Sequence, residues 1–84
     1  MKLYFQRYEY DSWSKPKTIV ASSFWKAAQR LIVPGLTLKH FKERYSEEVI
    51  YTSKTGMIIG TNPEETVLIA KTKKELNALR EWME

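Results

Sequence analysis

The chain of 84 residues is 43% hydrophobic, carries a net charge of +4 and contains no cysteine. Its length leaves room for one small domain, which area scaling expects to bury about 64% of its unfolded surface. The lack of cysteine excludes disulfide bonds, a thiolate zinc site and a catalytic thiol.

The first 21 residues predict a β-hairpin. Residues 3–10 are rich in aromatic side chains and predict a strand. Residues 11–16 carry turn residues and a proline, so they predict a loop. Residues 18–21 form a short, mostly β-branched segment that we expect to return antiparallel to the first strand.

A first helix follows this hairpin. Ser22 or Ser23 can cap it by accepting a hydrogen bond from a free backbone N–H, and Pro34-Gly35 ends it. Apolar side chains recur at the spacing of one helical stripe. The stripe consists of Phe24, Ala27, Ala28, Leu31 and Ile32. The opposite face of the helix carries Lys26, Gln29 and Arg30.

Residues 37–46 fit two secondary structures. Thr37 can cap a short helix with Leu38, Phe41 and Tyr45 on one side, whereas residues 36–39 also alternate like a strand. We favour the helix because this segment contains little β-branching.

The second half of the chain predicts three more strands. Residues 49–59 predict a β-hairpin, whose turn ends at Gly56 with a positive φ. Residues 62–65 predict another turn, and residues 66–70 predict another strand.

The last segment predicts a helix that begins with a capping box. In this motif Thr72 and Glu75 each satisfy the other's backbone N–H. The apolar side of the helix consists of Leu76, Leu79, Trp82 and Met83.

The predicted strands and helices together indicate the α+β fold class. We expect a single antiparallel sheet of about five strands, in the order β-β-α-(α)-β-β-β-α, with two or three helices packed on one face.

Two short patterns resemble catalytic motifs. Ser23 and Lys26 match the S-x-x-K pattern of the penicillin-recognising serine enzymes, and residues 54–56 match their K-T-G pattern. The S-D-N element of that family is absent, and 84 residues are too few to enclose its cleft. We interpret Ser23 as a helix cap and residues 54–56 as part of a turn. The single histidine, His40, lacks the partners of a triad or a zinc site and is expected on the surface. We therefore expect neither enzymatic activity nor a cofactor or metal site.

The N-terminal half combines aromatic and basic side chains. Residues 1–44 carry nine basic and three acidic side chains, a net charge of +6, whereas residues 45–84 carry net −2. If Leu3 and Phe5 point into the core, the tyrosines of the first strand face outward. Such a row can anchor a protein or stack bases, although strand tyrosines also simply bury their rings. The expected partner-binding surface comprises Arg7, Tyr8, Tyr10, Trp13, Lys15, Lys17, Lys26 and Arg30.

These patterns predict a small, non-enzymatic, cytoplasmic binding protein. It would act as a regulator, inhibitor or accessory factor, of the kind that phages and mobile elements often encode. A protein partner is favoured because the basic excess is modest, whereas Tyr, Trp and Arg are typical interface anchors. The alternatives are nucleic-acid binding through the same surface and self-association, as a homodimer or structural subunit, through an exposed strand. We expect no membrane partner, since the longest apolar run, residues 67–70, is too short to span a bilayer and residues 1–5 are too few for a signal-peptide core.

Overall fold

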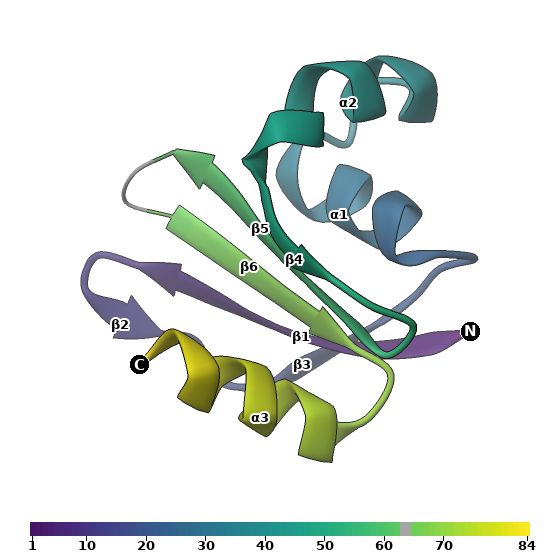
Figure 1. Cartoon of the computed structure of the whole chain (residues 1–84). Coiled ribbons are helices and arrows are strands. Elements are labelled where there is room, and N and C mark those ends of the chain that lie inside the picture. Colours follow the sequence, from purple (N-terminus) through teal and green to yellow (C-terminus); the bar gives the residue numbers. More distant parts are fainter. Residues whose placement is uncertain (63–64) are drawn as a thin grey trace.

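The computed structural model describes residues 1–62 and 65–84, which form an antiparallel sheet flanked by helices (Figure 1). The elements in chain order are β1 (Lys2–Glu9), β2 (Ser12–Trp13), β3 (Lys17–Val20), α1 (Phe24–Ile32), α2 (Leu38–Tyr45), the 3₁₀ turn η1 (Ser46–Glu48), β4 (Val49–Thr52), β5 (Gly56–Asn62), β6 (Glu65–Ala70) and α3 (Lys73–Met83). The predicted α+β class with one antiparallel sheet is confirmed. The middle of the predicted turn at residues 62–65 lies outside the described residues.

The strands follow the order β2-β1-β6-β5-β4, and β3 pairs with the same side of β1 as β2 does. Residues 12–20 therefore form one interrupted return strand. The prediction of a continuous loop at residues 11–16 was wrong, because Ser12 pairs with Glu9. Tyr10 and Asp11 both have positive φ (52° and 63°), which closes a two-residue hairpin turn and lets pairing resume at once.

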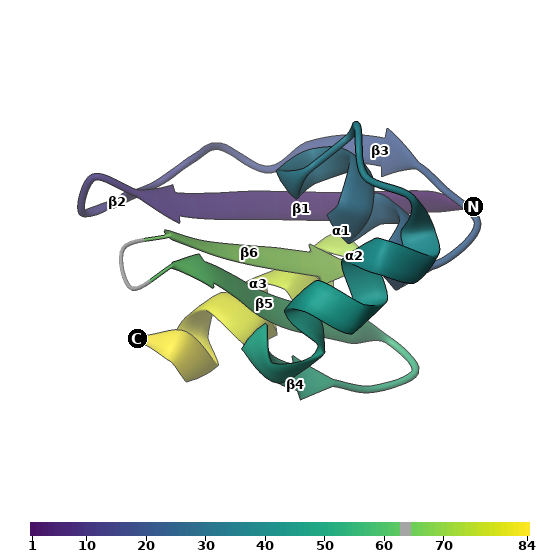
Figure 2. The ribbon, with the colours of Figure 1, turned by 90° about the horizontal axis from the view of Figure 1, so that it is seen from above.

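Helices cover both faces of the sheet, which corrects the prediction that all of them pack on one face. One core joins Leu3 and Phe5 of β1 to α1 and α2, and a second core joins Ile58 and Leu68 to α3. Figures 1 and 2 show α3 on the side of the sheet opposite α1 and α2. The reason lies in the central strands, where every residue from Val67 to Ala70 is buried. A strand that is apolar on both faces needs a cover on both faces.

The three helices begin at predicted caps. The side chains of Ser23, Thr37 and Thr72 accept hydrogen bonds from backbone N–H groups three residues later, at 3.0, 3.3 and 3.1 Å. The cap at Thr37 settles residues 38–45 as helix, as favoured. Only the Thr72 half of the predicted capping box forms. The Glu75 carboxylate instead accepts a hydrogen bond from the Thr55 hydroxyl (3.3 Å), so α3 is tied at its start to the β4–β5 turn.

Gly56 has a role other than the predicted one. The described glycines have no positive φ, so a left-handed turn conformation is not the reason for glycine here. Gly56 is buried beneath α3, and a Cβ on it would lie 2.7 Å from Leu79 Cδ1 and 3.2 Å from the Ile69 carbonyl oxygen. Glycine is favoured at this position because a side chain here would crowd Leu79 and the Ile69 carbonyl.

Two side chains lie on the side opposite to that expected. Gln29 was predicted on the exposed face of α1 but is 3% exposed, and its Nε2 donates to the carbonyls of Pro34 (3.0 Å) and Leu36 (2.7 Å). It therefore organises the loop between α1 and α2. Trp82 was predicted on the apolar face of α3 but is 63% exposed. The helix packs on β6, β1 and β5, and Trp82 points past this contact toward Tyr51 of β4, with 5.9 Å between ring centroids.

Candidate partner-binding surface

An apolar hollow of about 290 Å³ lies between the N-terminal hairpin and the end of α3. Its walls include Tyr8 of β1, Trp13 of β2, and Thr66 of β6. Met83 and Glu84 close it on the helix side. The apolar rings and the thioether make this hollow suited to an apolar side chain of a ligand.

The hairpin itself creates the aromatic wall of the hollow. The tight turn at residues 10–11 makes Tyr8 and Trp13 direct cross-strand neighbours, with 5.0 Å between ring centroids and an interplanar angle of 57°. Both rings are half-buried. Aromatic pairs of this kind stabilise a hairpin while leaving one ring surface for contact.

A buried glutamine fixes the position of the helix that forms the opposite wall. Gln6 is 3% exposed and lies on the same face of β1 as Tyr8. Its Nε2 donates to the Ser14 carbonyl (2.8 Å), and its Oε1 accepts from Arg80 Nη1 of α3 (3.1 Å). One side chain thus links the return strand to the last turn of α3, the two elements that flank the hollow.

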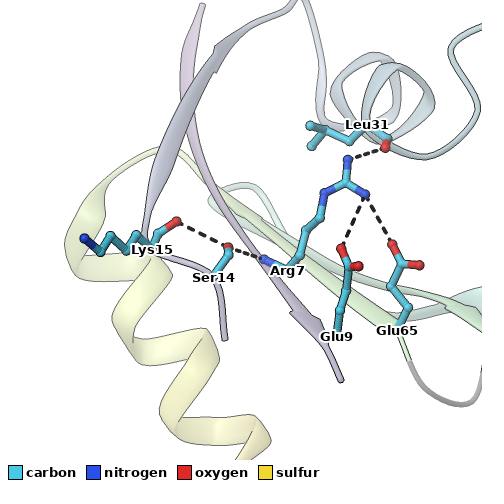
Figure 3. A network of polar contacts seen from close by, with 6 residues as sticks. All are labelled: Arg7, Glu9, Ser14, Lys15, Leu31 and Glu65. Atoms are coloured by element: carbon cyan, nitrogen blue, oxygen red, sulfur yellow. Dashed lines mark hydrogen bonds and ion pairs between the residues drawn. The ribbon is translucent and has the colours of Figure 1, made fainter. Parts of the chain in front are cut away.

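The Arg7 side chain points toward Leu31 of α1 (Figure 3). Arg7 therefore lies on the face of the sheet opposite Tyr8 and is not part of the hollow. Its Nη1 donates to Glu65 Oε1 at 3.2 Å, with Glu9 Oε1 at 4.0 Å. Its Nη2 donates to the Leu31 carbonyl near the C-terminal end of α1. A guanidinium that satisfies a helix-terminal carbonyl and a carboxylate is committed to the fold. We therefore assign Arg7 to holding α1 on the sheet.

The remaining predicted residues are distributed over the two sides of the sheet. Tyr10 lies at the hairpin tip and is 91% exposed, and Lys15 is exposed in the loop that follows β2. Lys17 pairs with Phe5 and so belongs to the α1 side. Lys26 and Arg30 lie on α1 itself, where Arg30 Nη1 donates to the Val20 carbonyl. The structure thus brings Tyr8 and Trp13 together but separates them from Arg7, Lys17 and the basic residues of α1.

The residues of the two catalytic-looking patterns have local structural partners. Ser23 caps α1, and the Ser53 hydroxyl accepts hydrogen bonds from the backbone N–H groups of Thr55 and Gly56, both at 3.2 Å. His40 is exposed on α2. Within residues 1–62 and 65–84, no three His, Asp or Glu side chains cluster closely enough to hold a metal ion.

Sequence reasoning missed the part of the hollow contributed by distant segments. Thr66 and Met83 lie more than 50 residues from Trp13 in the chain, and only the sheet order β2-β1-β6 with α3 above it brings them together. Local patterns carry no signal for such a contact. The available hint was the position of Met83 at the end of the apolar stripe of α3.

Comparison of the chain with family models, curated proteins and solved structures finds no match. Among the described helices, none has the length and apolar character needed to cross a membrane.

Proposed function

We propose that this protein is a small, non-enzymatic intracellular binding protein, a regulator, inhibitor or accessory factor, that captures an apolar side chain of a protein partner in the hollow beside Tyr8 and Trp13. The observation that carries the proposal is the paired aromatic wall facing Met83 across an accessible hollow. Half-buried Tyr and Trp rings next to an apolar pocket are the usual anchors of protein interfaces.

The charge at the hollow favours a protein over a nucleic acid. Glu84 lines the hollow, and Asp11 lies at the tip of the adjacent hairpin. Carboxylates repel phosphate groups, whereas base stacking on aromatic rings works best inside a positively charged groove.

The basic side chains of the N-terminal half support the approach of the partner. Lys15 and Lys17 are exposed, and attraction between charged surfaces acts over about 10 Å at ordinary ionic strength. They can therefore raise the association rate for an acidic partner without touching it. The aromatic hollow then determines how long the complex lasts.

The test is a pull-down from the native host with wild-type and variant proteins, followed by quantitative mass spectrometry and measured affinities. Trp13→Ala and Tyr8→Ala should each weaken binding of the recovered partner by about 1–2 kcal/mol. Trp82→Ala is the control, because Trp82 is a more exposed tryptophan that lies outside the hollow. Circular dichroism verifies that each variant is folded.

Two results would contradict the proposal. A partner that binds the folded Trp13→Ala/Tyr8→Ala double variant as tightly as the wild type would exclude the hollow as the site. Binding that is abolished by nuclease treatment and that falls steeply with salt would show a nucleic-acid partner instead.

A further inference from the structure

The second feature of interest is the free edge of β4, at the end of the sheet opposite the hollow. β4 is the last strand in the order β2-β1-β6-β5-β4, and no other described strand pairs with its outer side. Figure 2 shows β4 at the rim of the molecule. Ile50 is 50% exposed and Tyr51 40% exposed, although both residues are typical of buried strands.

The backbone of this edge is available for pairing. The Ser53 N–H donates inward to the Gly56 carbonyl (2.9 Å), and Thr52 pairs with Met57 in the adjoining register position. Because hydrogen-bonding groups alternate in direction along an antiparallel strand, the N–H and C=O of Thr52 point toward the free edge.

The two edges of the sheet differ in how well they are protected against pairing with a strand of another molecule. The edge formed by β2 and β3 carries Lys15, Pro16 and Lys17, residues that discourage pairing with another strand. β4, with the sequence Val-Ile-Tyr-Thr, contains no charge and no proline. The exposed Trp82 adds an aromatic ring beside Tyr51 on the α3 side of this edge.

The charges that flank β4 are arranged for a second copy of the same strand. Exposed Glu47 and Glu48 precede it, and exposed Lys54 follows it. Two β4 strands paired antiparallel about a two-fold axis place the acidic end of each opposite Lys54 of the other. Within the described part of the chain the ion pairs are those of Arg7 with Glu9 and Glu65. Glu47, Glu48 and Lys54 are therefore available to form ion pairs with another molecule.

We propose that the protein self-associates as a two-fold dimer through β4, which joins the sheets of two copies into one continuous sheet. The strand pair supplies backbone hydrogen bonds, the two Tyr51–Trp82 pairs come to lie on the same side of the joined sheet, and the flanking charges fix the register. Because the other edge is protected, the contact closes at two copies instead of growing into a fibre. The short strand, interrupted by a bulge between Val49 and Tyr51, makes this a weak, concentration-dependent dimer.

The test is sedimentation velocity of the whole chain from about 5 to about 500 μM, the range in which weak complexes form. We expect the mass to rise with concentration from 9.9 kDa toward twice that value and no further. In the dimer, Lys54→Glu places a glutamate of one copy opposite Glu47 and Glu48 of the other. Because this repulsive contact occurs twice in a two-fold dimer, the dissociation constant should rise by about tenfold. Adding Glu47→Lys and Glu48→Lys to that variant restores opposite charges and should restore the dimer.

Two further variants separate the edge from general surface effects. Lys39→Glu makes the same charge change at an exposed position of α2 and should leave the dissociation constant unchanged. Thr52→Pro removes the outward N–H and should abolish dimerisation. Urea melts verify that each variant folds. A chain that stays monomeric at the highest concentration overturns the proposal, as does open-ended assembly, or a dimer that Lys54→Glu leaves unchanged. A monomer that instead pairs with an unrelated strand peptide would show that another protein occupies the edge.

Discussion

Replacing Gly56 by alanine tests how closely α3 approaches the sheet. The added methyl group would lie 2.7 Å from Leu79 Cδ1 and 3.2 Å from the Ile69 carbonyl oxygen. Leu79 is 6% exposed, so it can move only by leaving its packed position. Overpacking of this kind costs about 1–3 kcal/mol, and the lower backbone entropy of alanine in the unfolded chain offsets about 0.4–1 kcal/mol.

We therefore expect Gly56→Ala to lower the free energy of unfolding by about 1–2 kcal/mol. In urea denaturation this is a fall of about 1 M in the midpoint for a chain of this size. Gly35→Ala is the matched control, because a Cβ at Gly35 meets nothing within 4 Å and its φ is not positive. That variant should be as stable as the wild type or up to about 1 kcal/mol more stable.

A double-mutant cycle identifies the contact responsible. Leu79→Ala alone should cost about 2–5 kcal/mol, because it leaves a cavity in the second core. In Gly56→Ala/Leu79→Ala the Leu79 Cδ1 methyl group, against which the new Cβ packs, is absent. The free energy of unfolding of the double variant should therefore fall by at least about 1 kcal/mol less than the sum of the two single losses. Strict additivity, or a Gly56→Ala midpoint equal to that of Gly35→Ala, would refute the close approach of α3 to β5.

Three further predictions concern side chains with structural roles, all measured by urea denaturation. Gln29→Met should cost about 1–3 kcal/mol, because it removes the donor that the carbonyls of the α1–α2 loop share; a loss below about 0.5 kcal/mol would contradict this. Ser23→Ala should cost about 1 kcal/mol and Ser22→Ala almost nothing, since only Ser23 caps α1; equal losses would place the cap elsewhere. Arg7→Lys should destabilise the fold by about 1 kcal/mol, because one ammonium group cannot hold both Glu65 and the Leu31 carbonyl; a variant as stable as the wild type would rule out this role.

The sequence predicted the elements well because their signals are local. Caps at Ser23, Thr37 and Thr72 and the apolar spacing of α1 depend on residues within one or two turns. The sheet pairing of neighbouring strands likewise follows from short turns. The face on which each helix packs depends on contacts between distant segments, and this is where the prediction was wrong. The unbroken apolar run at residues 67–70 already indicated a strand covered on both sides.

The candidate site was predicted only in part, for the same physical reason. Alternation along β1 correctly separates Leu3 and Phe5 from Tyr8, but it also assigns Arg7 to the face of the core. Because adjacent residues of a strand point to opposite faces of the sheet, Arg7 and Tyr8 cannot belong to the same binding surface. The tight turn at Tyr10 and Asp11 could not be foreseen, because neither residue is glycine and positive φ is uncommon for tyrosine.

The two proposed surfaces lie at opposite ends of the sheet, and this arrangement gives them a joint consequence. The hollow is at the β2 end and the free edge is at the β4 end, so a β4-mediated dimer leaves both hollows open. A partner with two binding segments would then gain affinity from the second contact, whereas a single-segment peptide would not. Titration of wild type and Lys54→Glu with one-segment and two-segment forms of the same ligand separates these cases. Equal affinity of both proteins for the one-segment ligand, together with weaker binding of the two-segment ligand by Lys54→Glu, is the expected result. A one-segment ligand that already discriminates between the proteins would show that the β4 edge belongs to the binding site itself.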